Sequence, residues 1–315
     1  MTPAGVELVD PGRDEALLQQ VADVAYAAQP EWERSVAFQL ASFGFDPGLE
    51  RRLAVLDGEP VGYASCGLIW MLAPDTPYAW VEVAVVEAAR GRGIGSALLA
   101  WAQGRAAAIG KGGVQIPCSS ARPEGIAFLE RRGFAEYDRM AGVELPLAGL
   151  ERPDVGLPDG VRLTSIAAEP GLLESLYAAC CEIYADLPDP EPVVIGTLEE
   201  WRVRDIEAGG QPLDGVLLAV AGDEVVGLSR LVVHERGRAV EHMITGVRRD
   251  WRGRGVALAL KRAAIGWAID AGAERMVAEN AVHNDAMRAI NAALGYVPGP
   301  DFVELRGPAG VSSAG

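Results

Sequence analysis

The 315-residue sequence has little that would place it in a membrane or in a disulfide-bonded framework. It contains no apolar run of about 18 residues or more, and its first 20 residues lack the basic start and apolar stretch of a signal peptide. The four cysteines follow no metal-ligand spacing and two are sequence neighbours, so we expect structural thiols and no metal site. These absences favour a cytoplasmic protein without a membrane partner.

Positive charge is also scarce. The chain has 28 Lys and Arg residues against 44 Asp and Glu, a net charge of −16, and its only lysines are Lys111 and Lys261. Residues 1–150 carry 12 bases and 19 acids, which leaves 16 and 25 for the remainder, so both halves are acidic. Nucleic acid is therefore not expected as a partner, because phosphate contacts need a basic surface, whereas a cationic substrate fits better.

A duplication is the strongest feature present. "RGRGIGSALL" at 90–99 returns as "RGRGVALALK" at 252–261, and the same offset of 162 relates the later "FLERRGF" to "INAALGY". Constant spacing over about 50 residues indicates an internal repeat. Because the segment 150–160 is rich in Pro and Gly, we place a linker there and predict domains at 1–149 and 158–315.

Both copies show the same order of elements and predict an α/β (α+β) fold. A short strand is followed by two helical segments, a hairpin, a strand that runs into the glycine cluster, an amphipathic helix, a further strand and helix, and a closing strand pair. The expected positions are strands at 6–9 and 161–165, helices at 14–28, 30–42, 170–185 and 197–207, turns at 57–58 and 222–223, and later strands at 114–118 and 275–278.

The two glycine clusters resemble anion-binding loops. Where a strand ends in glycines and opens a helix, the first backbone N–H groups lack partners and the helix dipole adds positive potential. Several N–H groups together suit a diphosphate better than a single carboxylate. Neither copy has the ending of a P-loop, and both break the GxGxxG pattern at its last position, so these two classes of phosphate site are excluded.

Both copies keep RxxGxG or RxxGxA, at 90–95 and 252–257. This pattern, with a "GF" or "GY" strand at a fixed distance, resembles the GNAT superfamily of N-acetyltransferases, whose tandem members include mycothiol synthase and a range of bacterial small-molecule acetyltransferases. The resemblance covers nearly the whole chain. It implies two tandem GNAT domains, each a mixed, mostly antiparallel sheet flanked by helices, with acetyl-CoA between two splayed strands.

By the same resemblance, the pyrophosphate of acetyl-CoA lies over the glycine cluster and its pantetheine arm pairs with the strand before it. An asparagine after the next strand often contacts the cofactor, a position held by Asn284 in the second copy and by Arg122 in the first. The alternatives are a tight turn that happens to use glycine, and solvated arginines. The candidate residues are Val83, Ala84, Val85, Arg90, Gly91, Arg92, Gly93, Ile94, Gly95 and Ser96, and Thr245, Gly246, Val247, Arg252, Gly253, Arg254, Gly255, Val256, Ala257, Asn280 and Asn284.

Glu241 is the first candidate for a catalytic base. It stands 11 residues before Arg252, as a general-base glutamate does in some GNAT enzymes, whereas the first copy has Ala79 there and Glu82 on the same strand. A base matters because on the order of one part in a thousand of an ordinary amine is neutral at pH 7. His242 is the second candidate and points to the opposite strand face. The alternatives are a solvated carboxylate and a packing histidine.

Asn291 occupies the position where many GNAT enzymes place a tyrosine that protonates the departing thiolate, and the first copy has Leu129 there. An asparagine can form hydrogen bonds but cannot act as an acid, so the general acid stays unassigned. Tyr296 is expected in the core, and His234 and His283 are expected in loops.

The sequence thus predicts an acetyl-CoA-dependent acyltransferase that acts on the primary amine of a small molecule, such as a secondary metabolite or an antibiotic-related compound. The second copy is expected to be catalytic and the first to bind the cofactor or to be structural, in a monomer or homodimer. Two alternatives stay open: a non-catalytic CoA-binding or regulatory protein, and an acyl donor other than acetyl-CoA.

Overall fold

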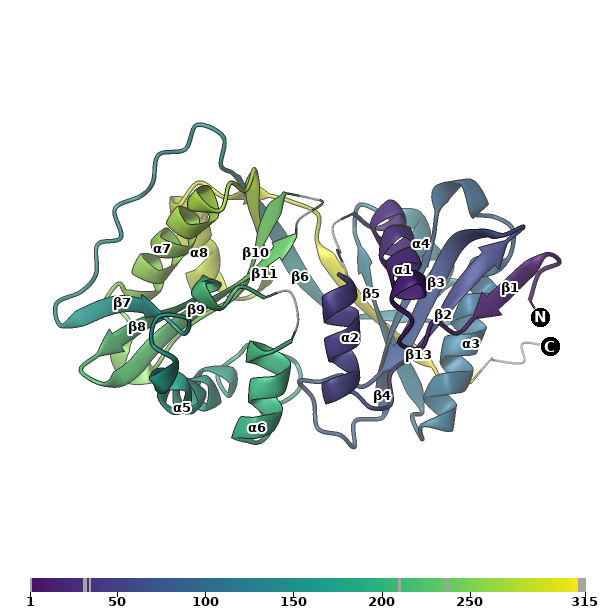
Figure 1. Cartoon of the computed structure of the whole chain (residues 1–315), viewed down its shortest axis with the longest axis horizontal. Coiled ribbons are helices and arrows are strands. Elements are labelled where there is room, and N and C mark those ends of the chain that lie inside the picture. The colour runs from purple at the N-terminus through teal and green to yellow at the C-terminus, as the bar shows by residue number, and fades with distance from the viewer. Residues whose placement is uncertain are drawn as a thin grey trace. The chain divides into compact units, whose positions relative to one another are not determined.

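The computed structural model describes residues 2–30, 33, 35–208, 211–234, 236 and 238–310. The chain forms two compact units (Figure 1), unit 1 with Met1–Arg139 and Phe302–Gly315, and unit 2 with Met140–Asp301. In each unit a mixed and mostly antiparallel sheet carries helices on both faces, which confirms the predicted fold class. No helix in the described part of the chain is long and apolar enough to cross a membrane.

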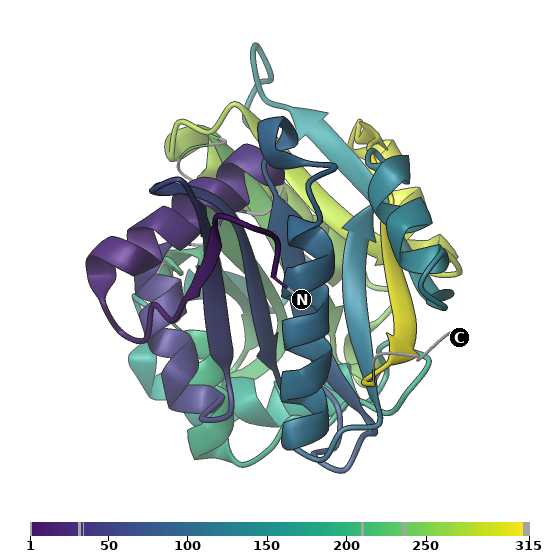
Figure 2. The same cartoon turned by 90° about the vertical axis from the view of Figure 1, so that its right-hand side faces the viewer.

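The sheet of unit 1 has the strand order β1-β2-β3-β4-β5-β13. Only β4 and β5 are parallel, and every other neighbouring pair is antiparallel. Figure 2 shows the sheet between α1 and α2 on one side and α3 on the other. The elements are β1 (Val6–Val9), β2 (Glu50–Leu56), β3 (Glu59–Gly67), β4 (Tyr78–Val85), β5 (Gly113–Ser119) and β13 (Phe302–Pro308), with α1 (Glu15–Ala28), α2 (Val36–Phe45), α3 (Ile94–Ala108) and α4 (Pro123–Glu130).

Alternation along the strands explains the two helical layers of unit 1. Tyr63 and Ala84 are cross-strand partners that pack against α1, whereas their neighbours Ala64 and Val83 pack on the α3 side. Caps define the helix starts: the Asp14 side chain accepts a hydrogen bond from the backbone N–H of Leu17 in α1. On α3, Ile94, Ala97 and Leu98 are buried and Trp101 is partly buried, as expected for the apolar side of an amphipathic helix.

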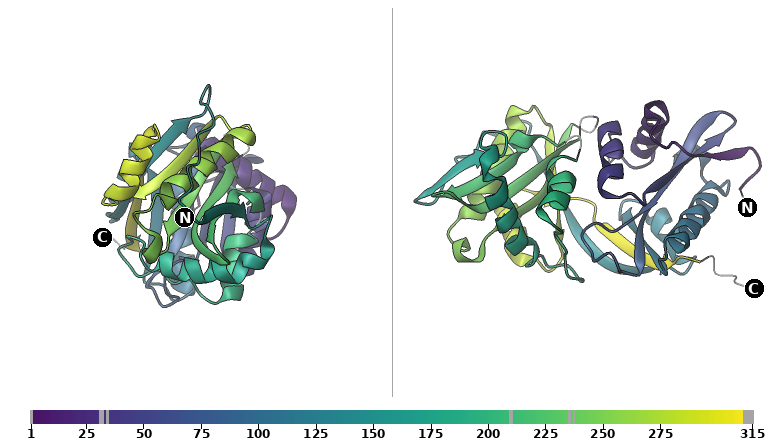
Figure 3. Two further views of the ribbon diagram at one scale, coloured as in Figure 1. Left: turned by 90° about the vertical axis from the view of Figure 1, so that its left-hand side faces the viewer. Right: turned by 60° about the horizontal axis from the view of Figure 1, so that its bottom comes forward.

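Unit 2 repeats this arrangement with the order β7-β8-β9-β10-β11-β6 and β12 on the outer side of β6. Its one parallel pair is β10–β11, and Figure 3 shows the helices on either side of this sheet. The elements are β7 (Val161–Ser165), β8 (Val216–Ala221), β9 (Glu224–His234), β10 (Ala239–Val247), β11 (Arg275–Ala281), β12 (Val297–Pro298) and β6 (Ala135–Pro146), with α5 (Leu173–Tyr184), α6 (Leu198–Trp201), α7 (Val256–Asp270) and α8 (Asp285–Ala293).

Each unit takes a closing strand from the other half of the sequence. The C-terminal strand β13 pairs with β5 of unit 1, and residues 140–146 of β6 pair with β11 of unit 2. This differs from the expectation that each copy closes with its own strand pair, and the compact units therefore do not follow the expected division at 1–149 and 158–315. The domain division of the duplicated sequence stays a prediction.

The parallel pair of each unit splays apart after three residues. In unit 1 the pairing covers 78–80 with 113–115, and in unit 2 it covers 239–241 with 275–277, after which the two strands separate. We call the point where this pairing ends the apex of the splay. In both units the strand leading from the apex is joined to the glycine loop by one short 3₁₀ helix, Glu87–Ala89 or Arg249–Trp251. The splay and the loop are therefore close together in the chain.

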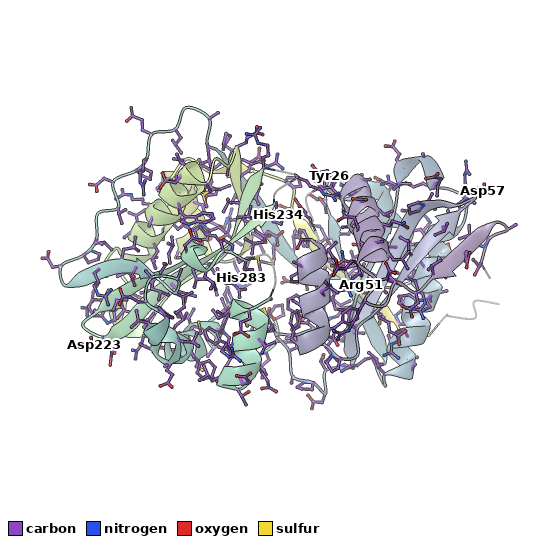
Figure 4. All side chains as sticks on the ribbon, viewed as in Figure 1. Tyr26, Arg51, Asp57, Asp223, His234 and His283 are labelled. Atoms are coloured by element: carbon purple, nitrogen blue, oxygen red, sulfur yellow. The ribbon has the colours of Figure 1, made fainter. Side chains whose placement is uncertain are left out.

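The predicted turns are confirmed and one predicted helix is displaced. Asp57 and Gly58 connect β2 to β3 with φ values of 54° and 88°, and Gly222 has a φ of 59° in the matching turn with Asp223. Asp57 and Asp223 are labelled in Figure 4. The helix expected at 30–42 is α2 at Val36–Phe45, because the Ser35 side chain caps its start by accepting from the backbone N–H of Phe38.

Candidate functional site

The glycine loops have the backbone conformation that their sequence requires. Gly91 and Gly93 have φ values of 76° and 81°, and Gly253 and Gly255 have 72° and 88°, a region that only glycine enters readily. Gly93 and Gly255 are the N-caps of α3 and α7, and among the described residues no side chain caps either helix. The first-turn N–H groups are therefore available to an anion, as the fit to a diphosphate requires.

Arg90 and Arg252 have the same structural role in the two copies. The Nε of Arg90 donates to the carbonyl of Val85 at 3.1 Å, and the Nε of Arg252 donates to the carbonyl of Val247 at 3.0 Å. Each arginine thus fixes the last residue of a strand to the loop that follows. Both guanidinium groups also remain partly exposed, so their contact with a bound phosphate stays a prediction.

A pocket of about 510 Å³ opens in unit 1 between β4, the glycine loop, β5 and α4. Its volume lies within the range of about 300–1,000 Å³ that is usual for small-molecule sites. Gln29 at the end of α1 also contributes to its wall. Of the residues expected to bind acetyl-CoA in this copy, the pocket is lined by Val83, Ala84, Val85, Arg90, Gly91, Gly93, Ile94, Gly95 and Ser96.

The glycine loop of unit 2 is richer in cations. Arg248 and Arg249 precede the cluster, and the guanidinium of Arg254 stacks over the ring of Trp251 at 4.8 Å. Asp186 accepts from Arg249 and Arg252 at 2.5 and 2.6 Å, and these bonds lower the pKa of its carboxyl group to about 2. The loop is therefore held in place from the α5 side.

Asn280 and Asn284 lie in different environments. Asn284 is the N-cap of α8, where its Oδ1 accepts from the backbone N–H of Met287 at 3.2 Å. Asn280 lies on β11 with 6% of its surface exposed, and its Nδ2 has no hydrogen-bond partner in the described structure. The equivalent of Asn280 in unit 1 is Cys118, which lines the pocket there.

A β-bulge changes the equivalence of the two copies at the apex. The register of β10 with β9 shifts between His242 and Ile244, which leaves Met243 as an extra and exposed residue. Counting back from Val85 and Val247 through this bulge, the structural equivalent of Glu241 is Trp80 and not Ala79. The constant offset of the sequences is therefore wrong by one residue at this point.

Glu241 forms a pair with a histidine that was expected in a loop. His234 is the last residue of β9, and its Nε2 lies 2.8 Å from the Oε2 of Glu241. His234 is buried, whereas the Glu241 side chain is 28% exposed. The carboxylate is therefore partly accessible to solvent, and the imidazole contacts it from the protein interior. His234 and His283 are labelled in Figure 4, and His283 lies in the turn between β11 and α8.

His242 lies on the opposite face of β10, as strand alternation predicts. The hydroxyls of Ser229 and Thr245 are 2.6 and 2.5 Å from its Nε2, and in the described chain its Nδ1 has no partner. Burial, and then the nearby charge of Lys261, hold the pKa of His242 well below its usual value. The imidazole is therefore neutral, and accepting a proton is unfavourable there.

Lys261 and Asn291 complete a buried polar cluster on this face. Lys261 on α7 is 2% exposed, and its Nζ lies 5.1 Å from the centre of the Tyr296 ring. Burial lowers the pKa of its ammonium group to about 7. Asn291 on α8 is 1% exposed, and neither atom of its side-chain amide has a hydrogen-bond partner among the described residues.

The corresponding face of unit 1 is apolar. The equivalents of His242, Lys261 and Asn291 there belong to one hydrophobic cluster and are Val81, Leu99 and Leu129. Glu82 lies on the other face of β4, where the hydroxyls of Tyr63 and Ser65 donate to its Oε2 at 3.2 and 3.5 Å. The titratable groups at the apex thus differ between the copies, and so does the backbone of the strand by the one extra residue of the bulge.

Sequence reasoning missed three residues of unit 2, namely Ser229, His234 and Lys261. His234 gave no local signal, because its partner is reached only across the strand pair. Lys261 did leave a signal, since it replaces Leu99, a core residue of the first copy. Alignment of the two helices residue by residue would have found it.

Comparison with known proteins gives a family match for both halves of the chain. Residues 17–134 and 177–296 each match the model of the Acetyltransferase (GNAT) family. Among curated proteins, the mycothiol acetyltransferase of Nocardia farcinica (strain IFM 10152) is 29% identical over 263 residues, which is 80% of this chain and 81% of that protein. The mycothiol acetyltransferase of Streptomyces coelicolor is 28% identical over 215 residues, which is 68% of this chain and 65% of that protein.

Two solved structures share the fold over 98% of this chain. A tandem GNAT protein from the clavulanic acid biosynthesis pathway, solved without AcCoA, has a TM-score of 0.75 at 21% identity and is covered completely. A GCN5-related N-acetyltransferase from Sphaerobacter thermophilus has a TM-score of 0.72 at 22% identity and is covered to 97%. At these identities the similarity establishes the architecture.

Proposed function

Because the chain belongs to the Acetyltransferase (GNAT) family in both of its halves, and is thus an N-acetyltransferase, we propose that unit 2 acetylates the primary amine of a small molecule with acetyl-CoA as donor. Unit 1 binds acetyl-CoA without performing the reaction. One observation supports this division: at the apex, unit 2 has the ionisable pair of Glu241 and His234, whereas unit 1 has Trp80 at the position of Glu241.

The residues of the loops fit the diphosphate of acetyl-CoA in both units. Uncapped N–H groups at the starts of α3 and α7 bind the phosphates, and the free edges of β4 and β10 bind the pantetheine arm. The bound molecule supplies an acetyl thioester, an activated acyl group with a stable thiolate as leaving group. Holding it beside the amine can account for about 7 to 11 kcal/mol of the barrier.

Glu241 takes the proton of the acceptor amine, directly or through one water. His234 holds the carboxylate at 2.8 Å and orients it toward the open side of the strand. Removal of that proton is needed because only the neutral amine is nucleophilic, and a positioned base contributes about 10²- to 10⁴-fold in rate. His242 is buried on the other face and does not serve as this base.

The acceptor is proposed to be a cation at neutral pH. The net charge of −16 favours the approach of a positively charged amine, and Glu241 is an exposed carboxylate at the point of reaction. The amine substrate of the mycothiol acetyltransferases is one candidate, since these enzymes are the curated relatives reported above.

The proposal is tested by thiol release from acetyl-CoA with a panel of amines that includes the mycothiol acetyltransferase substrate. We expect release with at least one amine, a calorimetric stoichiometry of two acetyl-CoA per chain, and an N-acetylated product by mass spectrometry. Binding of acetyl-CoA without release for any amine would instead support a non-catalytic CoA-binding protein.

A further inference from the structure

Unit 2 contains a cluster of buried polar side chains that the proposed base does not use. Its members share one face of β9, β10 and β11 beneath α7 and α8, and are Ser229, His242, Thr245, Lys261, Asn280 and Asn291. In unit 1 the equivalent positions are all without charge and, apart from the thiol of Cys118, purely hydrocarbon. Each buried polar group without a hydrogen-bond partner lowers the free energy of unfolding by about 1 to 3 kcal/mol. A cluster of them in a protein core therefore calls for an explanation.

The cluster lies where the reactive end of a bound thioester is expected. From Val247 at the end of β10 to His242 at the apex are five residues, one of which, Met243, is the extra residue of the bulge, so this stretch spans about 14 Å of extended strand. A pantetheine arm that begins at the loop and follows β10 therefore reaches the apex with its sulfur. Glu241 and His234 occupy one face of the strand at this point, and His242 and Lys261 occupy the other.

The unsatisfied atoms define the chemistry of the missing partner. Within the described chain, the Nδ2 of Asn280, both amide atoms of Asn291 and the Nδ1 of His242 have no partner. Lys261 forms no ion pair or hydrogen bond with any described residue; its Nζ lies 5.1 Å from the centre of the Tyr296 ring, and its charge lowers the pKa of His242. Most of these groups are donors, so the partner is an electron-rich group that enters from the splay.

We propose that Lys261 is the general acid of unit 2, which protonates the sulfur of coenzyme A as it departs, with Asn291 and His242 as positioning residues around the thiolate. This inference rests on the proposed function of unit 2. It places the proton donor on the face of β10 opposite the base. Glu241 then accepts the proton of the amine on one face, and Lys261 donates a proton to the thiolate on the other.

The proton balance is closed. The acceptor ammonium first loses one proton to solvent through Glu241 and becomes the neutral amine. Its nitrogen then forms a bond to the acetyl carbon, and a second proton passes from the nitrogen to Glu241. The carbon–sulfur bond breaks, its electron pair stays on sulfur, and Lys261 transfers a proton from its ammonium group to form the thiol. Glu241 then loses its proton to solvent and Lys261 regains one, so the enzyme is restored.

The pKa of Lys261 near 7 suits this role, because an acid works best when its pKa lies near the operating pH. The titratable groups that face it are His242 on β10, which is neutral, and Tyr296 after α8, whose pKa is raised by burial. Neither supplies a counter-charge. A thiolate at the apex would supply one and would raise the pKa of Lys261.

The chain offers a direct test, since Lys261 and Lys111 are its only lysines. Lysine-selective ¹⁵N labelling gives two side-chain signals, and Lys111, whose Nζ donates to the carbonyls of Pro74 and Thr76, is the internal reference. We expect coenzyme A to raise the pKa of Lys261 by about 1 or more, and desulfo-coenzyme A, which lacks the sulfur, to leave it unchanged. Equal effects of the two ligands would overturn the inference.

Kinetics give a second readout. Lys261→Met, which fits a position that holds leucine in unit 1, should lower kcat by about 100-fold or more, leave KM for acetyl-CoA within about twofold, and remove the fall of kcat with rising pH. Lys111→Arg should retain the wild-type profile. An unchanged kcat and pH profile in Lys261→Met would refute the acid role alone. Failure of coenzyme A to bind unit 2 would refute the proposed function and, with it, this inference.

Discussion

Units 1 and 2 both have the splay, which differs by the bulge at Met243 in β10, and they have different side chains behind it. Unit 1 fills the space under α3 and α4 with aliphatic groups, and unit 2 fills the same space with Lys261, His242 and Asn291. An aliphatic cluster stabilises a fold, whereas a buried ammonium without a counter-charge destabilises it. The two copies thus fill the same space by different means, unit 1 with packing groups and unit 2 with buried polar groups, to which we assign a role in the reaction.

The largest expected effect in this comparison concerns the base. Glu241→Gln should lower kcat by about 10²- to 10³-fold at pH 7 and by much less near pH 10, where more of the amine is already neutral. The control is Glu82→Gln in unit 1, which should leave kcat unchanged. Steady-state rates over this pH range check both variants, and parallel profiles for Glu241→Gln and wild type would remove Glu241 from the mechanism.

The next effect concerns stability. The folded-state pKa of Lys261 is about 7, below its ordinary value of 10.5, so between these values the unfolded chain binds more protons and wild-type stability rises with pH. Lys261→Leu, which copies Leu99 of unit 1, should therefore raise the free energy of unfolding by roughly 4 kcal/mol at pH 7 or below, and the gain should vanish toward pH 10.5.

Chemical denaturation of this variant at several pH values checks the prediction. Leu99→Met in unit 1 is the matched control and should change stability by less than about 1.5 kcal/mol at every pH. A Lys261→Leu protein that is less stable than wild type would show that the ammonium has a favourable partner in the fold.

The smallest effect concerns the two loop arginines. Arg90→Ala and Arg252→Ala each remove one hydrogen bond to a strand-end carbonyl and should each lower stability by about 1 kcal/mol. Only Arg252→Ala should also raise KM for acetyl-CoA, because we propose that unit 2 alone performs the reaction. Thermal melts and KM values distinguish the two effects, and an equal rise of KM in both variants would make the copies functionally alike.

Local features of the fold could be predicted from the sequence. Strand β1, helix α1, the turn at Asp57 and Gly58, and the glycine loops all follow from spacing and from the conformations that glycine permits. These features depend on neighbours in the sequence. The site residues Glu241 and Arg252 were located in the same way, by their distance from a local pattern.

Long-range features could not be predicted. The pairing of β13 with β5 of unit 1 joins segments nearly 190 residues apart, and no local pattern reports such a contact. The bulge at Met243 adds one residue without a sequence signal, so Trp80 was not recognised as the equivalent of Glu241. The contact of His234 with Glu241 likewise exists only across strands.

The central claim is that unit 2 alone performs the reaction. The most direct test compares kcat/KM for acetyl-CoA in Gly95→Asp and in Ala257→Asp, each relative to wild type. Both residues lie at the second position of a helix. A carboxylate there interacts favourably with the helix dipole, which preserves the fold, but it repels a bound diphosphate. At Gly95 a Cβ would meet its nearest neighbour at an ordinary 3.6 Å. We predict that Gly95→Asp stays within about threefold of wild type while Ala257→Asp loses about 100-fold or more. The opposite ranking in folded proteins would contradict the account.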